Sequence, residues 1–150
     1  MSELRIYRRR LPHWRLGDAI YFVTWRLDRG LPELDAVERD VVLSSLLHFH
    51  RARYLLYAGV VMNDHVHVLF EALGRFQVEE LIHTWKSFTA NRLQKAHRTG
   101  RIWQPEYWDR IIRDEREFDE AVGYIVANPY LRWPGIDSYP WIWIDAAAYD

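Results

Sequence analysis

The sequence predicts an α+β fold, with a central antiparallel or mixed sheet of four to five strands and helices packed mainly on one face. Segments rich in β-branched and aromatic residues alternate with segments whose apolar residues recur every three or four positions, in the order β-α-β-β-α-β-α. Only two residues separate the second and third strands, which favours a hairpin. The 150 residues are 49% hydrophobic, so we expect one domain over residues 1–150 with one sizeable core.

The four strands are predicted from composition and from the turn residues between them. β-branched and aromatic side chains suit the pleated surface of a sheet. The predicted strands cover residues 19–27, 54–62, 65–71 and 106–113. Asn63 and Asp64 lie between the middle two, and both residue types suit a tight turn. The second and third strands should therefore pair as neighbours.

Three helices are predicted from apolar residues in helical register. They cover residues 35–50, 77–97 and 115–127. Asp35 provides an N-cap for the first helix, Gly100 stops the second, and Pro129 ends the third. The tryptophan-rich tail that follows is expected to pack back on the domain rather than form a unit of its own.

The composition excludes several classes of site. The chain contains no cysteine, so disulfides, thiolate zinc sites and cysteine nucleophiles are absent, and any metal must be held by nitrogen and oxygen. The first ten residues lack the apolar stretch of a signal peptide, and no run approaches the roughly 18 apolar residues of a membrane span. We therefore expect a soluble cytoplasmic protein without a membrane partner.

Charge is distributed unevenly along the chain, whose formal net charge is −1. That total argues against nucleic-acid binding, because proteins that contact phosphates usually carry an excess of lysine and arginine. Residues 1–26, however, hold six arginines against two acids (+4), and residues 83–113 hold seven basic residues against two acids (+5). These segments provide a candidate basic surface for nucleic acid, with ordinary solvated charge as the alternative.

His65 and His67 are the first candidate metal ligands. Side chains two apart in a strand point to the same face, so the two imidazoles should lie side by side. Two neutral imidazoles can hold a divalent ion that takes further oxygen ligands. The alternative is a pair of hydrogen-bonded histidines on the sheet surface. His48 and His50 have the same spacing but fall in a predicted helix, where residues two apart diverge, so we interpret them as incidental.

Tyr124 and Asn128 form a second candidate pair, in the last predicted helix. Residues four apart lie on one face of a helix, so a phenol and a carboxamide should project together about one turn apart. Taken singly, each has an ordinary alternative: a packing tyrosine, and an asparagine at a helix end. The pairing carries more information than either residue.

Four blocks of sequence follow one another in a specific order. They are HVH at 65–67 after a short turn, WKSF at 85–88, WQPEYWDRIIR at 103–113 and YIVANP at 124–129. The ordered set closely resembles the HUH single-tyrosine transposases. The segments RRLPHW at 9–14 and YFVTWRL at 21–27 narrow the resemblance to REP-associated tyrosine transposases, and it covers about residues 8–132.

The resemblance implies a DNA strand that is cut by a tyrosine rather than by water. Tyr124 matches the nucleophile, which attacks a phosphorus of single-stranded DNA and leaves a 5′-phosphotyrosine and a free 3′-OH. His65 and His67 match the metal ligands, and Asn128 stands where the family commonly has Gln as the third ligand. Asn is one methylene shorter. Mg²⁺ or Mn²⁺ is the expected cofactor, although the imidazoles would also accept zinc or nickel.

The resemblance also implies a partner, single-stranded DNA with hairpin structure, and a bacterial, nucleoid-associated location for a monomer or homodimer. Unpaired bases stack on aromatic rings while the backbone follows basic grooves. The predicted DNA-binding residues are Arg8, Arg9, Arg10, Trp85, Lys86, Arg92 and Lys95, with a core position as the alternative for Trp85. Two other functions remain open: a hairpin-binding regulator with little or no cleavage activity, and a small metal hydrolase that uses water.

Overall fold

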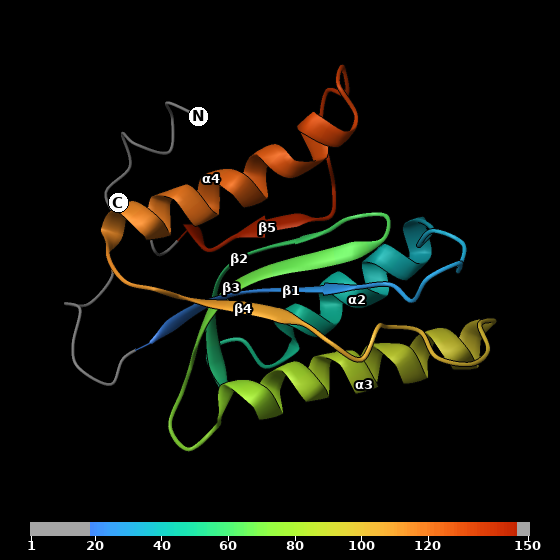
Figure 1. Ribbon diagram of the computed structural model, residues 1–150, viewed down its shortest axis with the longest axis horizontal. Coiled ribbons are helices and arrows are strands. Elements are labelled where there is room, and N and C mark those ends of the chain that lie inside the picture. The colour runs from blue at the N-terminus through green and yellow to red at the C-terminus, as the bar shows by residue number, and fades with distance from the viewer. Residues whose placement is uncertain (1–18, 147–150) are drawn as a thin grey trace.

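Strand-forming residues place five strands side by side in one antiparallel sheet (Figure 1). The computed structural model describes residues 19–146. The strands are β1 (Ile20–Arg26), β2 (Tyr54–Val61), β3 (His65–Ala72), β4 (Trp108–Ile112) and β5 (Ile142–Ile144). The helices are α2 (Ala36–His48), α3 (Val78–Ala96) and α4 (Glu115–Arg132). The strand order is β4-β1-β3-β2-β5, so the predicted α+β class with an antiparallel sheet is confirmed.

Helices cover both faces of the sheet, with α2 and α3 on one face and α4 on the other (Figure 1). Val23 and Trp25 of β1 pack with α2 and α3, whereas Ile20 packs with Phe118 and Ile125 of α4. The prediction of helices mainly on one face therefore holds for two of the three, and the sheet divides the core into two clusters. Within residues 19–146, no helix has both the length and the apolar composition needed to cross a bilayer.

Helix α4 continues beyond its predicted end. The sequence predicted a stop at residue 127, because Pro129 lacks an N–H and disfavours helix in the residue before it. In the structure Pro129 is buried inside α4, and the Trp133 N–H donates to the Pro129 carbonyl at 2.8 Å. Packing of this last turn offsets the helix hydrogen bond that proline removes. Asn128 therefore stays in helical register with Tyr124.

Strand β5 was not predicted, because three residues are too few for a periodic signal. It exists through pairing with residues 58–60 of β2. The Tyr139 hydroxyl donates to the Val61 carbonyl at 2.5 Å, and Trp141 Nε1–H donates to Asp40 Oδ1 at 2.7 Å. The tryptophan-rich tail thus lies along the β2 edge of the sheet.

The turn between β2 and β3 fixes the point at which β3 begins. The Met62 N–H donates to the His65 carbonyl at 2.8 Å and closes the hairpin. The Asn63 side chain donates to Glu33 at 2.9 Å, and its carbonyl accepts the Leu34 N–H at 2.8 Å. The turn is therefore anchored to the loop that precedes α2, and His65 follows it at a defined position.

Candidate active site

Strand β3 presents His65 and His67 on the face of the sheet that α4 covers. In the pairing of β1 with β3, Thr24 lies opposite His67 and Arg26 lies opposite His65. The two imidazole centroids are 4.7 Å apart, and their planes meet at 76°. The alternation of a strand thus brings the two rings side by side.

The Nδ1 atom of each histidine is engaged by a neighbouring oxygen. His67 Nδ1 lies 2.7 Å from Thr24 Oγ1, and His65 Nδ1 lies 2.7 Å from Asp64 Oδ1. In the tautomer where Nδ1–H donates to these oxygens, Nε2 of each ring carries the lone pair. Metal-binding histidines commonly present Nε2 in this way, with the other nitrogen oriented by an oxygen acceptor.

His67 is the more deeply buried of the two rings, at 3% exposure. Its ring stacks on Phe22, with centroids 5.4 Å apart and planes at 14°. Burial, with smaller contributions from His65 and Arg26, lowers the pKa of His67 to about 3. The ring is therefore neutral near pH 7, as a metal ligand must be. Among residues 19–146, the buried Nε2 has no hydrogen-bond partner. Buried side-chain nitrogens in proteins normally have a hydrogen-bond partner, so this atom has an unsatisfied lone pair that a metal ion could use.

Tyr124 projects from α4 toward the same place. Val122 and Ile125, on the neighbouring side of the helix, pack against the sheet and hold α4 over β2 and β3. The Tyr124 ring lies edge-on to His67, with centroids 5.2 Å apart, and to Phe22, with centroids 5.9 Å apart. Its side chain is nevertheless 49% exposed. The phenol can therefore be reached from solvent while touching the buried histidine.

Asn128 follows Tyr124 by one turn of α4 and is half-buried. Within the described part of the chain, its carboxamide makes no hydrogen bond. The predicted phenol and carboxamide pair thus shares one side of a helix, as four-residue spacing requires.

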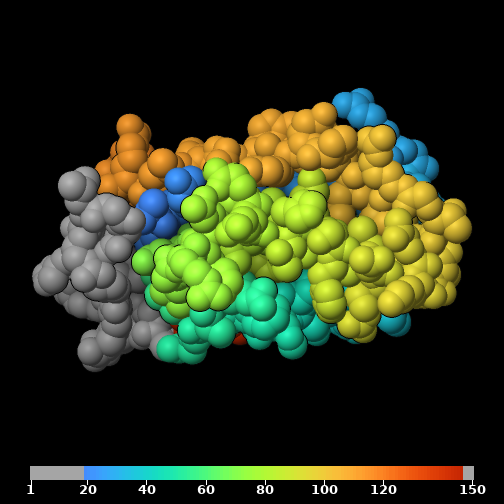
Figure 2. Space-filling model, turned by 90° about the horizontal axis from the view of Figure 1, so that it is seen from below, coloured from blue at the N-terminus to red at the C-terminus, as the bar shows by residue number. Residues whose placement is uncertain are grey.

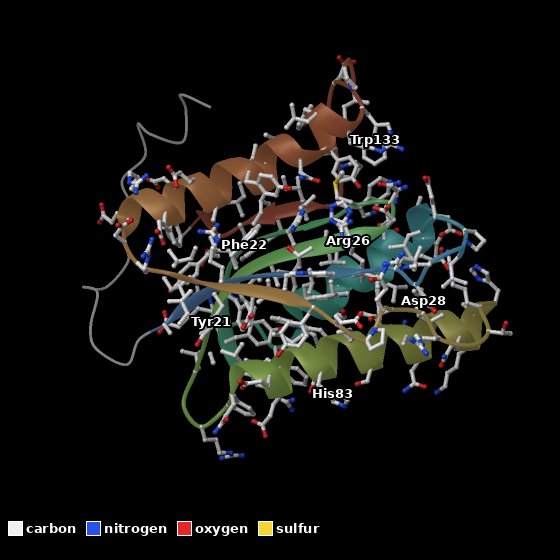
Figure 3. All side chains as sticks on the ribbon, in the orientation of Figure 1. Tyr21, Phe22, Arg26, Asp28, His83 and Trp133 are labelled. Carbon is white, nitrogen blue, oxygen red and sulfur yellow. The ribbon has the colours of Figure 1, made fainter. Side chains whose placement is uncertain are left out.

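His67 and Tyr124 open into a cavity of about 600 Å³, which we call the active-site hollow. His65 and Asn128 are not among the residues that line it. Side chains from β1, β3, β4 and α4 line it. Its lining residues are Phe22, Thr24, Arg26, His67, Trp108, Arg110, Glu120 and Tyr124. Figure 3 shows Phe22 and Arg26 on the α4 side of β1, whereas Tyr21 lies on the side of α3.

Sequence reasoning missed Thr24, Trp108 and Arg110 as members of this site. Each lies on a strand whose place in the sheet is set by long-range pairing. Alternation alone puts Trp108 and Arg110 on one face of β4. The missing information was that this face and the face bearing His67 are the same.

Comparison with known proteins places the chain in a family. Residues 47–128, more than half of the chain, match the family model described as "Transposase IS200 like". The chain belongs to this family. The matched segment contains both histidines, Tyr124 and Asn128. A curated relative, the REP-associated tyrosine transposase of Escherichia coli (strain K12), is 25% identical over 132 residues, which are 86% of this chain and 73% of that protein.

Two solved structures share the fold of this IS200-like transposase. A REP-associated tyrosine transposase bound to a REP hairpin aligns with a TM-score of 0.69 at 19% identity, covering 88% of this chain and 82% of the other. A transposase from Deinococcus radiodurans aligns with a TM-score of 0.53 at 21% identity, covering 77% and 95%. At these identities the likeness concerns the fold.

The predicted role of Trp85 in DNA binding is wrong. Trp85 is 3% exposed, and its ring packs against Tyr54 and Phe70 with centroids 4.9 and 4.8 Å away. Its Nε1–H donates to the Tyr54 hydroxyl at 3.2 Å. No face of the indole is left for a base, so Trp85 is a core residue.

The other predicted DNA-binding residues of this transposase have different surroundings. Lys86 Nζ donates to the carbonyls of Gln104 and Pro105 at 2.8 and 3.1 Å, so it anchors the segment before β4. Arg92 and Lys95 are exposed on α3, whose face of the molecule is seen in Figure 2. That face lies across the sheet from Tyr124, and their role stays a prediction. Arg8, Arg9 and Arg10 lie outside the described residues.

His48 and His50 do not form a metal pair, although the reason differs from the predicted one. Helix α2 ends at His48, so His50 is outside it. His50 Nδ1 accepts the Leu56 N–H at 2.9 Å, and its Nε2 lies 3.9 Å from Asp145. His50 thus connects the loop after α2 to β2 and to the C-terminal tail.

One further group of potential metal ligands comprises Asp35, Glu38 and His97. The Glu38 carboxylate already accepts hydrogen bonds from Arg98 Nε at 2.6 Å and Arg98 Nη2 at 2.9 Å, together with the Asp35 N–H at 2.9 Å. Burial alone would raise the pKa of Glu38, but Arg98 and the Asp35 N–H outweigh it and lower the pKa. A metal here would have to displace Arg98, so the group joins α2 to α3 instead.

Proposed function

We propose that this chain is a metal-dependent endonuclease and strand transferase for single-stranded DNA associated with hairpins, cutting through a covalent 5′-phosphotyrosine on Tyr124. One observation carries the proposal. A solvent-accessible phenol touches a buried, neutral imidazole whose Nε2 is unpaired within the described residues, with ring centroids 5.2 Å apart. Membership of a transposase family supports this reading.

The proposed reaction exchanges one phosphodiester bond for another. The Tyr124 oxygen attacks the phosphorus, the bond from phosphorus to the 3′ oxygen breaks, and the 5′ side of the DNA becomes linked to Tyr124. The phenol loses its proton to solvent, and the leaving 3′ oxygen takes up a proton to become a 3′-OH. Attack of a 3′-OH on the phosphotyrosine reverses the step or joins a new end. No oxidant or energy source is required.

His65 and His67 would hold the metal through Nε2, with the Asn128 carboxamide as third ligand. The donor set fits, because both Nδ1 atoms face oxygens and His67 Nε2 is buried without a partner in the described region. A bound Mg²⁺ or Mn²⁺ would neutralise charge on the phosphoryl oxygens and favour ionisation of a phenol whose pKa is ordinarily about 10. Thr24 and Asp64 would orient the two rings.

The DNA partner is inferred from relatives. One is named a REP-associated tyrosine transposase, and another is described as bound to a REP hairpin. We propose that this chain likewise binds hairpin DNA with a single-stranded portion. Arg26 and Arg110 in the active-site hollow supply positive charge for its backbone.

The test is a search for a covalent adduct. The protein is incubated with labelled single-stranded hairpin DNA and Mg²⁺ or Mn²⁺, then analysed on a denaturing gel. Tyr124→Phe should give no adduct, whereas Tyr130→Phe, which removes an exposed phenol from the same helix, should behave as the unsubstituted chain. Cleavage by Tyr124→Phe would indicate a water-using hydrolase. DNA binding without any adduct would indicate a hairpin-binding regulator.

A further inference from the structure

We propose that Trp108 and Arg110 of β4 form a subsite for one unpaired nucleotide next to the scissile phosphate. In this subsite the base stacks on the Trp108 indole and a neighbouring phosphate pairs with the Arg110 guanidinium. The inference rests on the proposed function of the same site and specifies how it holds its substrate.

Sheet register puts both residues beside the reactive groups. Trp108 is opposite Thr24 and Arg110 is opposite Phe22 in the pairing of β4 with β1. Their side chains share the face of Phe22 and line the active-site hollow together with Tyr124. Because Thr24 in turn contacts His67, Trp108 is two strands away from the proposed metal ligand.

Trp108 is the most exposed tryptophan among the described residues. Trp25, Trp85 and Trp103 are buried and the three tryptophans between residues 133 and 143 are partly buried, whereas Trp108 is 55% exposed on the edge strand β4. An indole that keeps a large surface in water beside a cationic cavity is suited to stacking with a base, since every base offers a π-face. Inside a duplex both faces of a base are covered by neighbouring pairs, so the exposed indole suits an unpaired base.

Arg110 has no carboxylate in direct contact within the described residues; its charge acts on Glu117 only at longer range, and Glu117 is bound by Arg113. Its guanidinium lies 5.5 Å from the centroid of Phe22, the ring that also stacks on His67 and meets Tyr124 edge-on. Within residues 19–146, Arg110 forms neither a hydrogen bond nor an ion pair with a side chain. Arg113, by contrast, is bound to Glu117 at 2.7 Å.

The one acid in the hollow does not cancel this charge. Glu120 lies one turn before Tyr124 on α4, and its carboxylate accepts Arg116 Nη1–H at 3.1 Å. The two arginines of the hollow, Arg26 and Arg110, thus exceed its acids. A phosphodiester backbone, which carries one negative charge per nucleotide, complements such a surface, and a guanidinium can bind phosphate through two N–H groups.

The experiment measures DNA binding in the Tyr124→Phe background with metal chelated, so that cleavage plays no part. Two fluorescein-labelled probes are compared by anisotropy: a blunt hairpin, and the same hairpin with a short oligothymidine extension. Trp108→Ala should weaken binding of the extended probe about tenfold and leave the blunt probe unchanged, while Trp108→Phe should keep most of the affinity. Arg110→Gln should weaken the extended probe and reduce the salt slope of its binding by about one.

Ile111→Ala is the matched control, because Ile111 is 51% exposed on the same strand but faces away from the hollow. A second measurement is direct: extension thymines are replaced by 5-iodouracil, and the photocrosslink is mapped by mass spectrometry. We expect it on Trp108 in the tryptic peptide 102–110. Equal effects of Trp108→Ala and Ile111→Ala, or crosslinks only elsewhere, would overturn the subsite and leave a Tyr124 adduct unaffected. Absence of DNA binding by the unsubstituted chain would overturn both proposals.

Discussion

Replacing Thr24 by valine should weaken metal binding by His67 while preserving the fold. Valine has nearly the same shape as threonine but cannot accept the hydrogen bond that Oγ1 makes with His67 Nδ1 at 2.7 Å. Without that acceptor, the tautomer of His67 with the proton on Nδ1 is no longer favoured, and the tautomer with the proton on Nε2 becomes populated. The ligand atom is then blocked in part of the molecules.

The size of the effect follows from the position of the bond. Both Thr24 and His67 are buried, at 9% and 3% exposure. Loss of an oxygen that orients a metal-binding histidine typically lowers metal affinity 10- to 100-fold, or about 1.4–2.8 kcal/mol. The stranded Nδ1–H should also cost about 1–3 kcal/mol of folding stability.

The assay is titration of the metal-free protein with Mn²⁺, followed by calorimetry or by loss of the free-ion electron paramagnetic resonance signal. Thr24→Ser restores the hydroxyl and should recover most of the affinity. Thr99→Val, at an exposed threonine outside the site, serves as control. If Thr24→Val folds normally and binds Mn²⁺ as tightly as the unsubstituted chain, Thr24 does not orient His67 for metal binding.

Three further predictions concern the fold. Glu38→Gln should lower the free energy of unfolding by about 3 kcal/mol, because it leaves Arg98 buried without its carboxylate. The control Glu79→Gln, at an exposed position, should change it by less than about 0.5 kcal/mol. Urea denaturation measures both values. Hydrogen bonds from Arg113 lower the pKa of Glu117 from 4.5 to about 2, so its contribution is complete above pH 4.5 and is lost as the pH falls toward 2. The urea midpoint of the unsubstituted chain should therefore exceed that of Glu117→Gln at pH 6 and approach it near pH 2, and a constant difference would contradict the ion pair. Trp85→Ala should cost about 3–5 kcal/mol, against little for the exposed Phe88→Ala on the same helix; similar small losses for both would mean that Trp85 is not a core residue.

Local periodicity was sufficient for most of the secondary structure. The segments containing Val23, Val68 and Leu81 follow strand or helix patterns over seven or more residues, and their elements formed within a few residues of the predicted bounds. Local periodicity failed for segments that are stabilised by contacts with residues distant in the sequence. The last turn of α4 is kept by burial of Pro129, and β5 is kept by pairing with β2.

In the candidate site, too, the features within one element were predictable and the contacts between elements were not. His65 with His67, and Tyr124 with Asn128, are pairs within one element, so spacing alone brought each pair together. The contact between Tyr124 and His67 depends on how α4 packs on the sheet. Residue spacing does not encode that packing, and only the family resemblance implied the contact. Spacing was also insufficient for Trp85, because an aromatic residue in helical register is equally consistent with a core position and with a ligand-binding surface.

Strand β5 has a consequence for the behaviour of the protein in concentrated solution. The neighbouring strand β2 reads YLLYAGVV, eight residues without a charge, and its outer edge would be an open template for another chain if β5 were removed. Short uncharged segments of high β-propensity are the usual starting points of aggregation. The three residues of β5 occupy part of that edge. Chains shortened before residue 139 should therefore lose solubility sooner than they lose secondary structure.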